Sequence, residues 1–244
     1  VIPGLLASGE RVVVTGEEGL GKSILIRQVA ICAAAGFDPF EYTHIPAKRV
    51  LFVDAENPLR IMVARLKEIR DTLASRSRHT EDRFWVRRFP QGLDLNTAAG
   101  RLSLHNLCRF FRPDLLCIGP VYKLALDNGQ NADAQARAVT DTIDQLREEF
   151  GCAVILEHHS PFGQGETRSV RPFGSSVWLR WPEFGFGLAA DRDNPGPGRR
   201  AQLKHWRGAR DERPWPHLLE ALPNSDRALP WNEVDPPQVG RTAA

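Results

Sequence analysis

The sequence predicts an α/β protein, with a mostly parallel, twisted β-sheet covered by helices on both faces. Short apolar runs alternate along the chain with longer segments of helical periodicity, the order of a sheet built from strand–helix–strand units. The first apolar run, residues 11–15, leads directly into the glycine-rich turn Gly16-Glu17-Glu18-Gly19-Leu20-Gly21-Lys22-Ser23, which opens a helix. With 244 residues the chain is long enough to bury one full core.

The first half of the chain supplies three expected strands and three expected helices. Each strand is a short apolar run, and the helices carry apolar residues at spacings of three and four. In chain order we expect strand 11–15, helix 22–35, strand 49–54, helix 59–73, strand 84–86 and helix 102–111. Gly36 follows the first helix and Pro113 follows the third, as is typical of helix ends.

The second half repeats this order and then changes character. In chain order we expect strand 115–118, loop 124–134, helix 139–150, strand 152–156, loop 161–172, and shorter strands or sheet extensions at 177–181, 184–189 and 201–205. From about residue 223, proline and polar residues recur without periodicity, which predicts an extended or disordered tail. We therefore place one domain over residues 1–222 and a tail over residues 223–244.

The composition is that of an ordinary soluble protein. Apolar residues make up 42% of the chain and charged residues 25%, and no apolar run is long enough to span a bilayer. The net charge of +2 neither requires nor excludes a nucleic-acid partner. Isolated cysteines, mostly in apolar stretches, indicate reduced core residues of a cytoplasmic protein; they are Cys32, Cys108, Cys117 and Cys152. The first residue is Val1 and not Met, which is typical of a domain cut from a longer protein.

The turn after the first strand matches the phosphate-loop pattern G-x-x-x-x-G-K-[ST] in its required context, between a buried strand and a helix. Backbone N–H groups of such a turn, with the positive end of the following helix, bind phosphate. Lys22 is expected to contact the β- and γ-phosphates of ATP, and the Ser23 hydroxyl to ligate Mg²⁺. The expected nucleotide-binding residues are Gly16, Glu17, Glu18, Gly19, Leu20, Gly21, Lys22, Ser23 and Ile24. The alternative is a glycine-rich turn that binds nothing.

Polar residues follow the strand 49–54, at the sheet edge where ligands of open parallel sheets bind. Glu56 is the candidate for orienting the water that attacks the γ-phosphate. The alternative is a capping role at the helix that begins near Pro58, which fits Asp54 and Asn57 better than Glu56.

The core strand 115–118 ends in Gly119, at a position where we expect an acidic residue that holds Mg²⁺ through water. Asp114 lies at the opposite end of that strand. Two alternatives remain open: either Asp54 is the metal-side acid, or Mg²⁺ is held by Ser23 and the phosphates alone.

Neutral donors follow the strand 152–156. His158, His159 and Ser160 are placed to sense the γ-phosphate, and His159 is our candidate. A pair of histidines can also indicate zinc, but no further ligand has metal-site spacing nearby.

Four segments in this order resemble the RecA-like ATPase core of hexameric replicative helicases, closest to the RepA-type of plasmids and phages, with DnaB-type helicases as relatives. The segments are residues 10–23, Val53-Asp54-Ala55-Glu56-Asn57-Pro58, Leu156-Glu157-His158-His159-Ser160 and Phe173-Gly174-Ser175-Ser176. The likeness covers about residues 3–215. It implies a RecA-like P-loop NTPase fold, ATP hydrolysis with Mg²⁺, and a homo-oligomer, a hexameric ring with ATP at each subunit interface.

The resemblance also implies that a neighbouring subunit supplies basic fingers to the γ-phosphate. The matching segment is Leu203-Lys204-His205-Trp206-Arg207-Gly208-Ala209-Arg210, similar to Lys-x-Arg-x-Gly but with altered spacing. It makes Arg207 the finger and Lys204 its partner, and the spacing leaves Arg210 open. An arginine finger contributes about 10³- to 10⁵-fold to kcat, so a monomer is expected to be nearly inactive. The alternative is a solvated, basic strand edge.

In such rings the loops after the third and fourth core strands face a central channel. Here these are residues 123–137 and 161–172, and they offer Lys123, Arg168 and Arg171 for contact with single-stranded DNA. The alternative is a mobile loop that is basic because the whole chain favours arginine.

The leading hypothesis is an ATP-hydrolysing motor on single-stranded DNA, the replicative-type helicase core of a plasmid, phage or mobile element. One alternative is a nucleotide-gated DNA-binding or assembly module with weak hydrolysis, suggested by Gly119. Another is a recombinase-like or circadian-type RecA relative. A primase, fused or separate, is a further partner that would lie outside these residues.

Overall fold

The computed structural model describes residues 1–74, 82–126, 129, 131–161, 169–191, 199–208, 213–221 and 229–234. Its strands are β1 (Arg11–Gly16), β2 (Val50–Asp54), β3 (Phe84–Arg88), β4 (Leu115–Gly119), β5 (Ala153–Glu157), β6 (Phe184–Ala190), β7 (Arg199–Arg207), β8 (Leu218–Ala221) and β9 (Asn232–Glu233). Its helices are α1 (Lys22–Ala35), α2 (Leu59–Ala74), α3 (Ala98–Phe111), the 3₁₀-helix η1 (Val121–Lys123), α4 (Ala132–Phe150) and the short α5 (Val177–Arg180).

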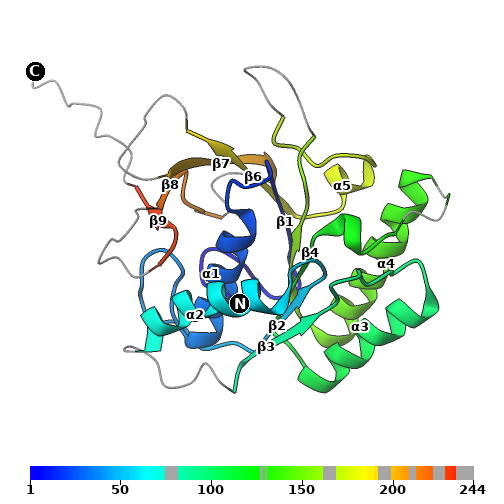
Figure 1. The fold of residues 1–244 in the computed structure, drawn as a ribbon, viewed down its shortest axis with the longest axis horizontal. Helices are drawn as coiled ribbons and strands as arrows, with labels where there is room; N and C mark the ends of the chain where they lie inside the picture. The colour runs from blue at the N-terminus through cyan, green and yellow to red at the C-terminus, as the bar shows by residue number, and fades with distance from the viewer. Residues whose placement is uncertain are drawn as a thin grey trace, which may run out of the picture.

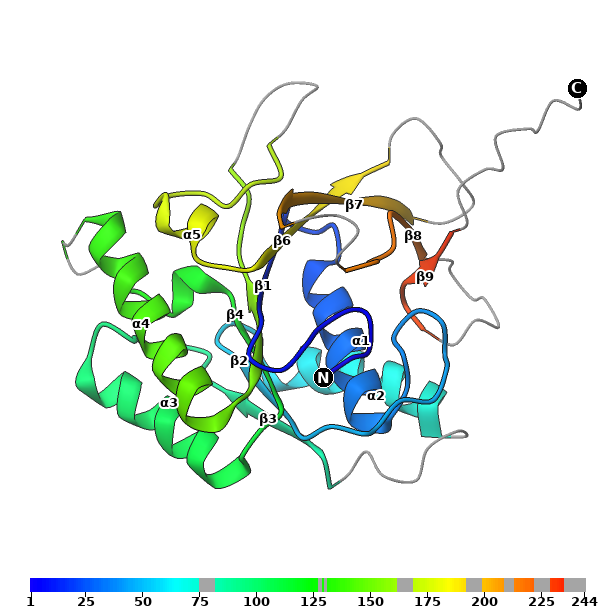
Figure 2. The ribbon, with the colours of Figure 1, turned by 180° about the vertical axis from the view of Figure 1, so that it is seen from behind.

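Within the described residues the strands form one sheet in the order β3-β2-β4-β5-β1-β6-β7-β8-β9. The strands from β3 to β6 are parallel, and β7, β8 and β9 continue the sheet in antiparallel pairing. Figures 1 and 2, seen from opposite sides, show α1 and α2 on one face of the sheet and α3 and α4 on the other. The predicted α/β fold with a mostly parallel sheet is confirmed.

Alternation along the strands explains why both faces are covered. Val12 and Val14 of β1 pack in the cluster that contains α1, whereas Val13 between them packs in the cluster that contains α3 and α4. The outer side of α1 is covered as well, because Ile31 packs with Ile69 of α2. The central strands are thus buried on both faces, and their polar ends are the parts of the strands left to meet a ligand.

The ends of the helices follow local chemistry. The Thr97 hydroxyl accepts a hydrogen bond from the backbone N–H of Gly100 at 3.0 Å and caps α3. The Asn131 side chain caps α4 in the same way, accepting from the N–H of Ala134 at 2.8 Å. Gly36 ends α1 with a positive φ of 80°, as its position in the sequence predicts.

The prediction of a strand over residues 177–181 is wrong. Residues Val177–Arg180 form the short helix α5. The Ser175 hydroxyl accepts a hydrogen bond from the N–H of Val177 at 3.0 Å and starts the turn. Trp178 is buried in the core while Trp181, three residues on, packs beside it, and that spacing suits a helical turn.

The predicted tail contains part of the fold. Trp231 is 1% exposed, and β9 pairs with β8. The side chain of Gln28 on α1 exchanges two hydrogen bonds with the backbone of Trp231, at 2.7 and 2.8 Å. A single large aromatic residue in a proline-rich stretch has no periodicity, so the sequence pattern missed this segment. Residues 222–228 and 235–244 lie outside the described residues.

No helix in the described residues has the length and apolar content needed to cross a membrane.

Candidate functional site

The glycine-rich turn connects the end of β1 to the start of α1, as predicted. Its glycines adopt conformations that L side chains rarely take, with φ of 76° at Gly19 and 105° at Gly21. A side chain at Gly21 would also meet the ring of Trp231, because a Cβ there would lie 2.8 Å from it. The indole N–H of Trp231 donates to the Gly21 carbonyl at 3.2 Å, so the buried tryptophan helps to fix the conformation of the turn.

A cavity of about 580 Å³ opens over this turn. It lies at the carboxyl ends of the parallel strands, where ligands bind in open α/β sheets. It is lined by Glu18, Gly19, Gly21, Lys22, Ser23, Ile24, Glu56, Asn57, Pro58, Arg65, Glu157, His159 and Arg199. The structure therefore brings the predicted residues Lys22, Ser23, Glu56 and His159 together around one space.

Lys22 is held inside this cavity, with only 4% of its surface exposed. Its ammonium group donates to the Glu17 carbonyl of the same turn at 3.3 Å. Burial lowers the pKa of Lys22, while the nearby carboxylates of Glu157, Glu18 and Glu56 act in the opposite direction. A phosphate group placed in the turn would give this buried cation a closer anionic partner.

Ser23 has a partner that sequence reasoning did not propose. Its hydroxyl donates to Oε1 of Glu157, the last residue of β5, at 2.6 Å. A serine hydroxyl and a carboxylate are hard oxygen donors of the kind Mg²⁺ takes, with phosphate and water completing the shell. The described residues contain no group of three or more His, Cys, Asp or Glu side chains placed to hold a metal. The residues present thus fit a magnesium ion bound together with a nucleotide, in which the chain supplies few ligands.

The structure does not support Asp54 as the metal-side acid. Asp54 is 3% exposed and does not line the cavity; its Oδ2 is 3.1 Å from Nη2 of the buried Arg27. Its Oδ1 accepts hydrogen bonds from the backbone N–H groups of Glu56 and Asn57 at 3.0 and 2.8 Å. The geometry favours a structural role for Asp54, close to the capping alternative: Oδ1 holds the loop that leads into α2, and Oδ2 pairs with Arg27.

Glu56, in contrast, faces the cavity from that same loop. The Tyr122 hydroxyl, in η1, donates to Oε1 of Glu56 at 2.5 Å. Burial, and then the neighbouring Glu56 carboxylate, raises the pKa of Tyr122, so this phenol remains a donor. Tyr122 also contacts the ring of His159, with ring centres 5.4 Å apart. The sequence gives no indication that Tyr122 orients Glu56.

The two adjacent histidines have different surroundings. His159 lines the cavity, and burial followed by the charge of Lys22 lowers its pKa, which favours the neutral ring. His158 points away, against Trp178 at 5.3 Å between ring centres, and its Nδ1 lies 2.8 Å from the His159 carbonyl oxygen. Of this pair, His159 is the one placed to meet a bound phosphate.

Other predicted residues do not reach this cavity. Lys204 and Arg207 are exposed on β7, which lies two strands from β1 in the sheet. The Arg207 guanidinium donates to the carbonyl of Pro182 at 3.2 Å. Arg210 lies outside the described residues.

The predicted DNA contacts also lie apart from the cavity lining. Arg171 is exposed and follows Val170, whose carbonyl accepts a hydrogen bond from the Thr15 hydroxyl of β1. Lys123, in η1, is half-buried, with its Nζ 5.6 Å from the centre of the Tyr122 ring. Arg168 lies outside the described residues.

Two cations that the sequence did not single out line the cavity, Arg65 of α2 and Arg199 of β7. Arg199, the first residue of β7, donates to the carbonyl of Gly19 in the phosphate loop at 3.0 Å. No motif surrounds Arg199, so only the antiparallel return of β7 toward this end of the sheet reveals it.

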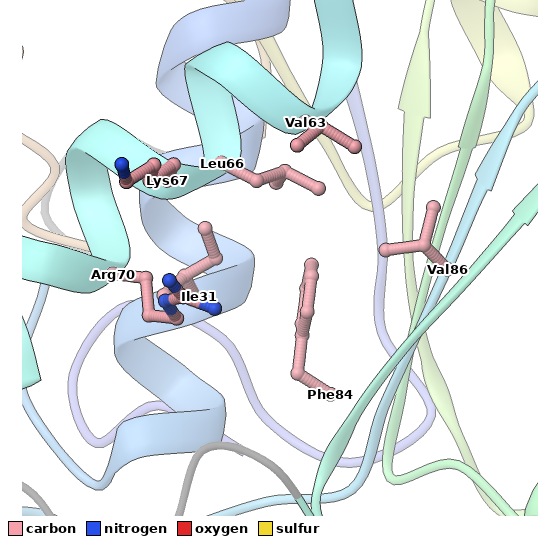
Figure 3. Close-up of a pocket in the computed structure, with 7 residues that line it drawn as sticks. All are labelled: Ile31, Val63, Leu66, Lys67, Arg70, Phe84 and Val86. Carbon is pink, nitrogen blue, oxygen red and sulfur yellow. The ribbon is translucent and has the colours of Figure 1, made fainter. Parts of the chain in front are cut away.

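A second cavity, of about 380 Å³, has a different character (Figure 3). It lies between α1, α2 and β3, where Ile31, Leu66 and Phe84 converge, with Lys67 and Arg70 on the α2 side. None of the phosphate-loop residues lines it. Its lining is mostly apolar and includes no glycine-rich turn, so it has no cradle of backbone N–H groups for a triphosphate.

Comparison with known proteins agrees with the site. The AAA domain family matches residues 1–165, which span the phosphate loop and every strand from β1 to β5. No curated protein matches the chain. The match covers more than half of the sequence, and it includes each element that lines the cavity except Arg199. The chain therefore belongs to the AAA domain family and is a nucleotide-hydrolysing ATPase with a P-loop NTPase fold.

Proposed function

We propose that this chain is the ATPase core of a motor that acts on single-stranded DNA, of the kind found in replicative helicases of plasmids, phages or mobile elements. The observation that carries the proposal is the convergence of Lys22, Ser23, Glu56 and His159 on one cavity at the carboxyl ends of the strands. These are the groups that the resemblance to RepA-type helicases requires in one subunit.

In the proposed reaction, residues of this chain bind the phosphates of ATP and position the attacking water. The backbone N–H groups of the phosphate loop and the Lys22 ammonium bind the β- and γ-phosphates of ATP. Glu56, held by Tyr122, accepts a hydrogen bond from the attacking water and aligns it with the γ-phosphorus. His159 offers a neutral ring nitrogen to the same phosphate. Mg²⁺, when bound, would neutralise phosphate charge and polarise the transferred group.

Lys204 and Arg207 do not line the cavity of their own subunit, although Arg199, at the start of the same strand, does. We propose that Lys204 and Arg207 act on the nucleotide of a neighbouring copy, in a homo-oligomeric ring. The exposure of both side chains is compatible with that role. Single-stranded DNA would run past Arg171, Lys123 and Arg168, and a primase would be a separate or fused partner.

A mixing experiment tests the ring. Lys22→Ala removes the phosphate-binding cation, and Arg207→Ala removes the finger; each variant alone is expected to lose about 10²-fold or more of the ATPase rate. A mixture of the two variants should recover part of the activity, because some interfaces pair an intact cavity with an intact Arg207. The measurement is the steady-state ATPase rate with and without single-stranded DNA. The matched control is Lys67→Ala, which removes a cation that lines the second cavity and not the first.

If the mixture assembles but stays as inactive as its components, Arg207 does not act across an interface. If wild-type turnover does not depend on Lys22, the ATPase assignment of this cavity fails. If turnover depends on Lys22 but does not change with single-stranded DNA, the ATPase assignment stands and the proposed action on DNA is wrong.

Gly119 favours a second candidate, a nucleotide-gated DNA-binding or assembly module with weak hydrolysis, because β4 ends without a carboxylate. A recombinase-like relative would share the site but assemble differently. Electron microscopy with an ATP analogue separates a ring from a filament. Single-turnover kinetics distinguish a hydrolase from a nucleotide-gated module. In a nucleotide-gated module, the rate of ATP hydrolysis would be far lower than the rate at which bound ATP dissociates.

A further inference from the structure

We propose that Glu157, from β5, supplies the magnesium-side carboxylate that the sequence lacks at Gly119 on β4. This inference rests on the proposed binding of ATP in this cavity and adds a role for one residue within it. It resolves the two alternatives that the sequence leaves open, Asp54 or no acid at all.

The topology places positions 119 and 157 side by side and on the same face of the sheet. β4 and β5 are neighbouring parallel strands, with Ile118 opposite Leu156. Cys117 and Ile155, two residues before each position, both pack in the cluster that contains α1. Because side chains alternate along a strand, a side chain at 119 and one at 157 both point toward the start of α1, where Ser23 lies.

Only one of these two positions has room for a side chain. A Cβ built on Gly119 would lie 2.6 Å from the Cβ of Glu157, closer than real Cβ contacts, and 3.1 Å from its backbone nitrogen, which is tight. Gly119 also has a φ of 157°, a conformation that side chains rarely adopt. In this chain the carboxylate therefore comes from β5, and the glycine on β4 leaves the space that Glu157 occupies.

The contacts of Glu157 are those of a metal-side acid. It is 8% exposed, lines the cavity, and accepts the Ser23 hydroxyl at 2.6 Å. In phosphate-loop proteins the loop serine and one acid together hold Mg²⁺. The pair here consists of the predicted serine and an acid from the adjacent strand.

Nucleotide binding with and without magnesium tests the proposal apart from catalysis. The affinity of wild type and Glu157→Gln for a non-hydrolysable ATP analogue is measured by calorimetry, once with Mg²⁺ and once with EDTA. With Mg²⁺ we expect Glu157→Gln to bind the analogue about 10- to 100-fold more weakly. With EDTA we expect it to bind as well as wild type or better, because a carboxylate beside the phosphates is gone. A merely structural role would weaken binding in both conditions.

The matched control is Glu220→Gln. Glu220 is also a buried strand glutamate, 7% exposed, but it pairs with Arg200 on β7 and does not line the cavity. Its substitution should leave both affinities unchanged. Electron paramagnetic resonance of Mn²⁺ with the same analogue gives a second measurement, in which Glu157→Gln should lose bound Mn²⁺.

The outcomes separate the two proposals. If wild type binds no nucleotide, the proposed function fails. If wild type shows a magnesium-dependent affinity that Glu157→Gln retains, the ATPase proposal stands and the role of Glu157 is overturned. A variant that keeps Mn²⁺ but loses turnover would also overturn it, because Glu157 would then act on the attacking water.

Discussion

Asp54 and Glu157 are both carboxylates at the last position of a buried parallel strand, at the same edge of one sheet. Asp54 is tied to Arg27 and to the N–H groups of the loop that follows it. Glu157 accepts the hydroxyl of Ser23 and lines the cavity. One carboxylate holds the fold and the other faces the cavity.

The difference shows that position at a strand end does not determine the role of an acid. What decides it is which groups saturate its oxygens. The buried Arg27 lies 27 residues before Asp54 in the chain and reaches it because α1 packs against β2. Among the described residues no ion pair holds Glu157 to the fold: Ser23 donates to one of its oxygens, and the cation near it is Lys22, inside the cavity itself.

The largest expected effect comes from Asp54→Asn. This variant leaves the Arg27 guanidinium, which is 1% exposed, without a counter-charge. We expect it to lower the free energy of unfolding by about 3–5 kcal/mol, measured by urea denaturation. An amide nitrogen would also face the Arg27 donors.

Arg27→Met combined with Asp54→Asn is the control for that prediction. It removes the stranded charge, so it should recover part of the lost stability. If Asp54→Asn is as stable as wild type, the ion pair does not hold the fold and the contrast between the two acids disappears.

The two histidines after β5 give a smaller version of the same contrast, and it depends on pH. Burial lowers the pKa of His158 from its ordinary 6.5 to about 4. As the pH falls below 6.5, the unfolded chain binds a proton that the folded chain excludes, so stability decreases until about pH 4 and then levels off. The loss should reach up to about 3 kcal/mol.

This pH effect is measured as the difference in unfolding free energy between wild type and His158→Gln from pH 7 to pH 4. The difference isolates His158 from other groups that titrate in the same range. Parallel curves for the two proteins would show that His158 takes up its proton in the folded state.

The smallest effect on stability is expected from Glu157→Gln. The amide oxygen can still accept the Ser23 hydroxyl, and the buried Lys22 keeps the nearby carboxylates of Glu18 and Glu56. The free energy of unfolding should change by less than about 1 kcal/mol. A loss as large as that of Asp54→Asn would place Glu157 among the residues that hold the fold. The proposed difference in role between Asp54 and Glu157 would then be wrong.

Local patterns predicted the elements that carry the site. The strand ending at Gly16, the turn and the helix from Lys22 all lie where the phosphate-loop pattern puts them. Such a pattern is readable because glycine conformations and a buried strand are local properties. The strand predicted over residues 177–181 is wrong, because a single helical turn is too short to show the repeating apolar pattern of a helix.

The parts that could not be predicted depend on contacts between distant residues. Trp231 supports a turn more than two hundred residues earlier, and Arg199 reaches Gly19 from an antiparallel strand. Neither pairing leaves a trace in spacing or periodicity. Tyr122 holds Glu56 in the same non-local way.

The sequence by itself determined that this chain has a phosphate-binding turn between a strand and a helix, since backbone conformation there depends on neighbouring residues. Only the tertiary structure decided which carboxylate meets the serine of that turn. The reason is steric and electrostatic: Gly119 leaves a space that Glu157 fills, and Arg27 neutralises Asp54, the other candidate acid.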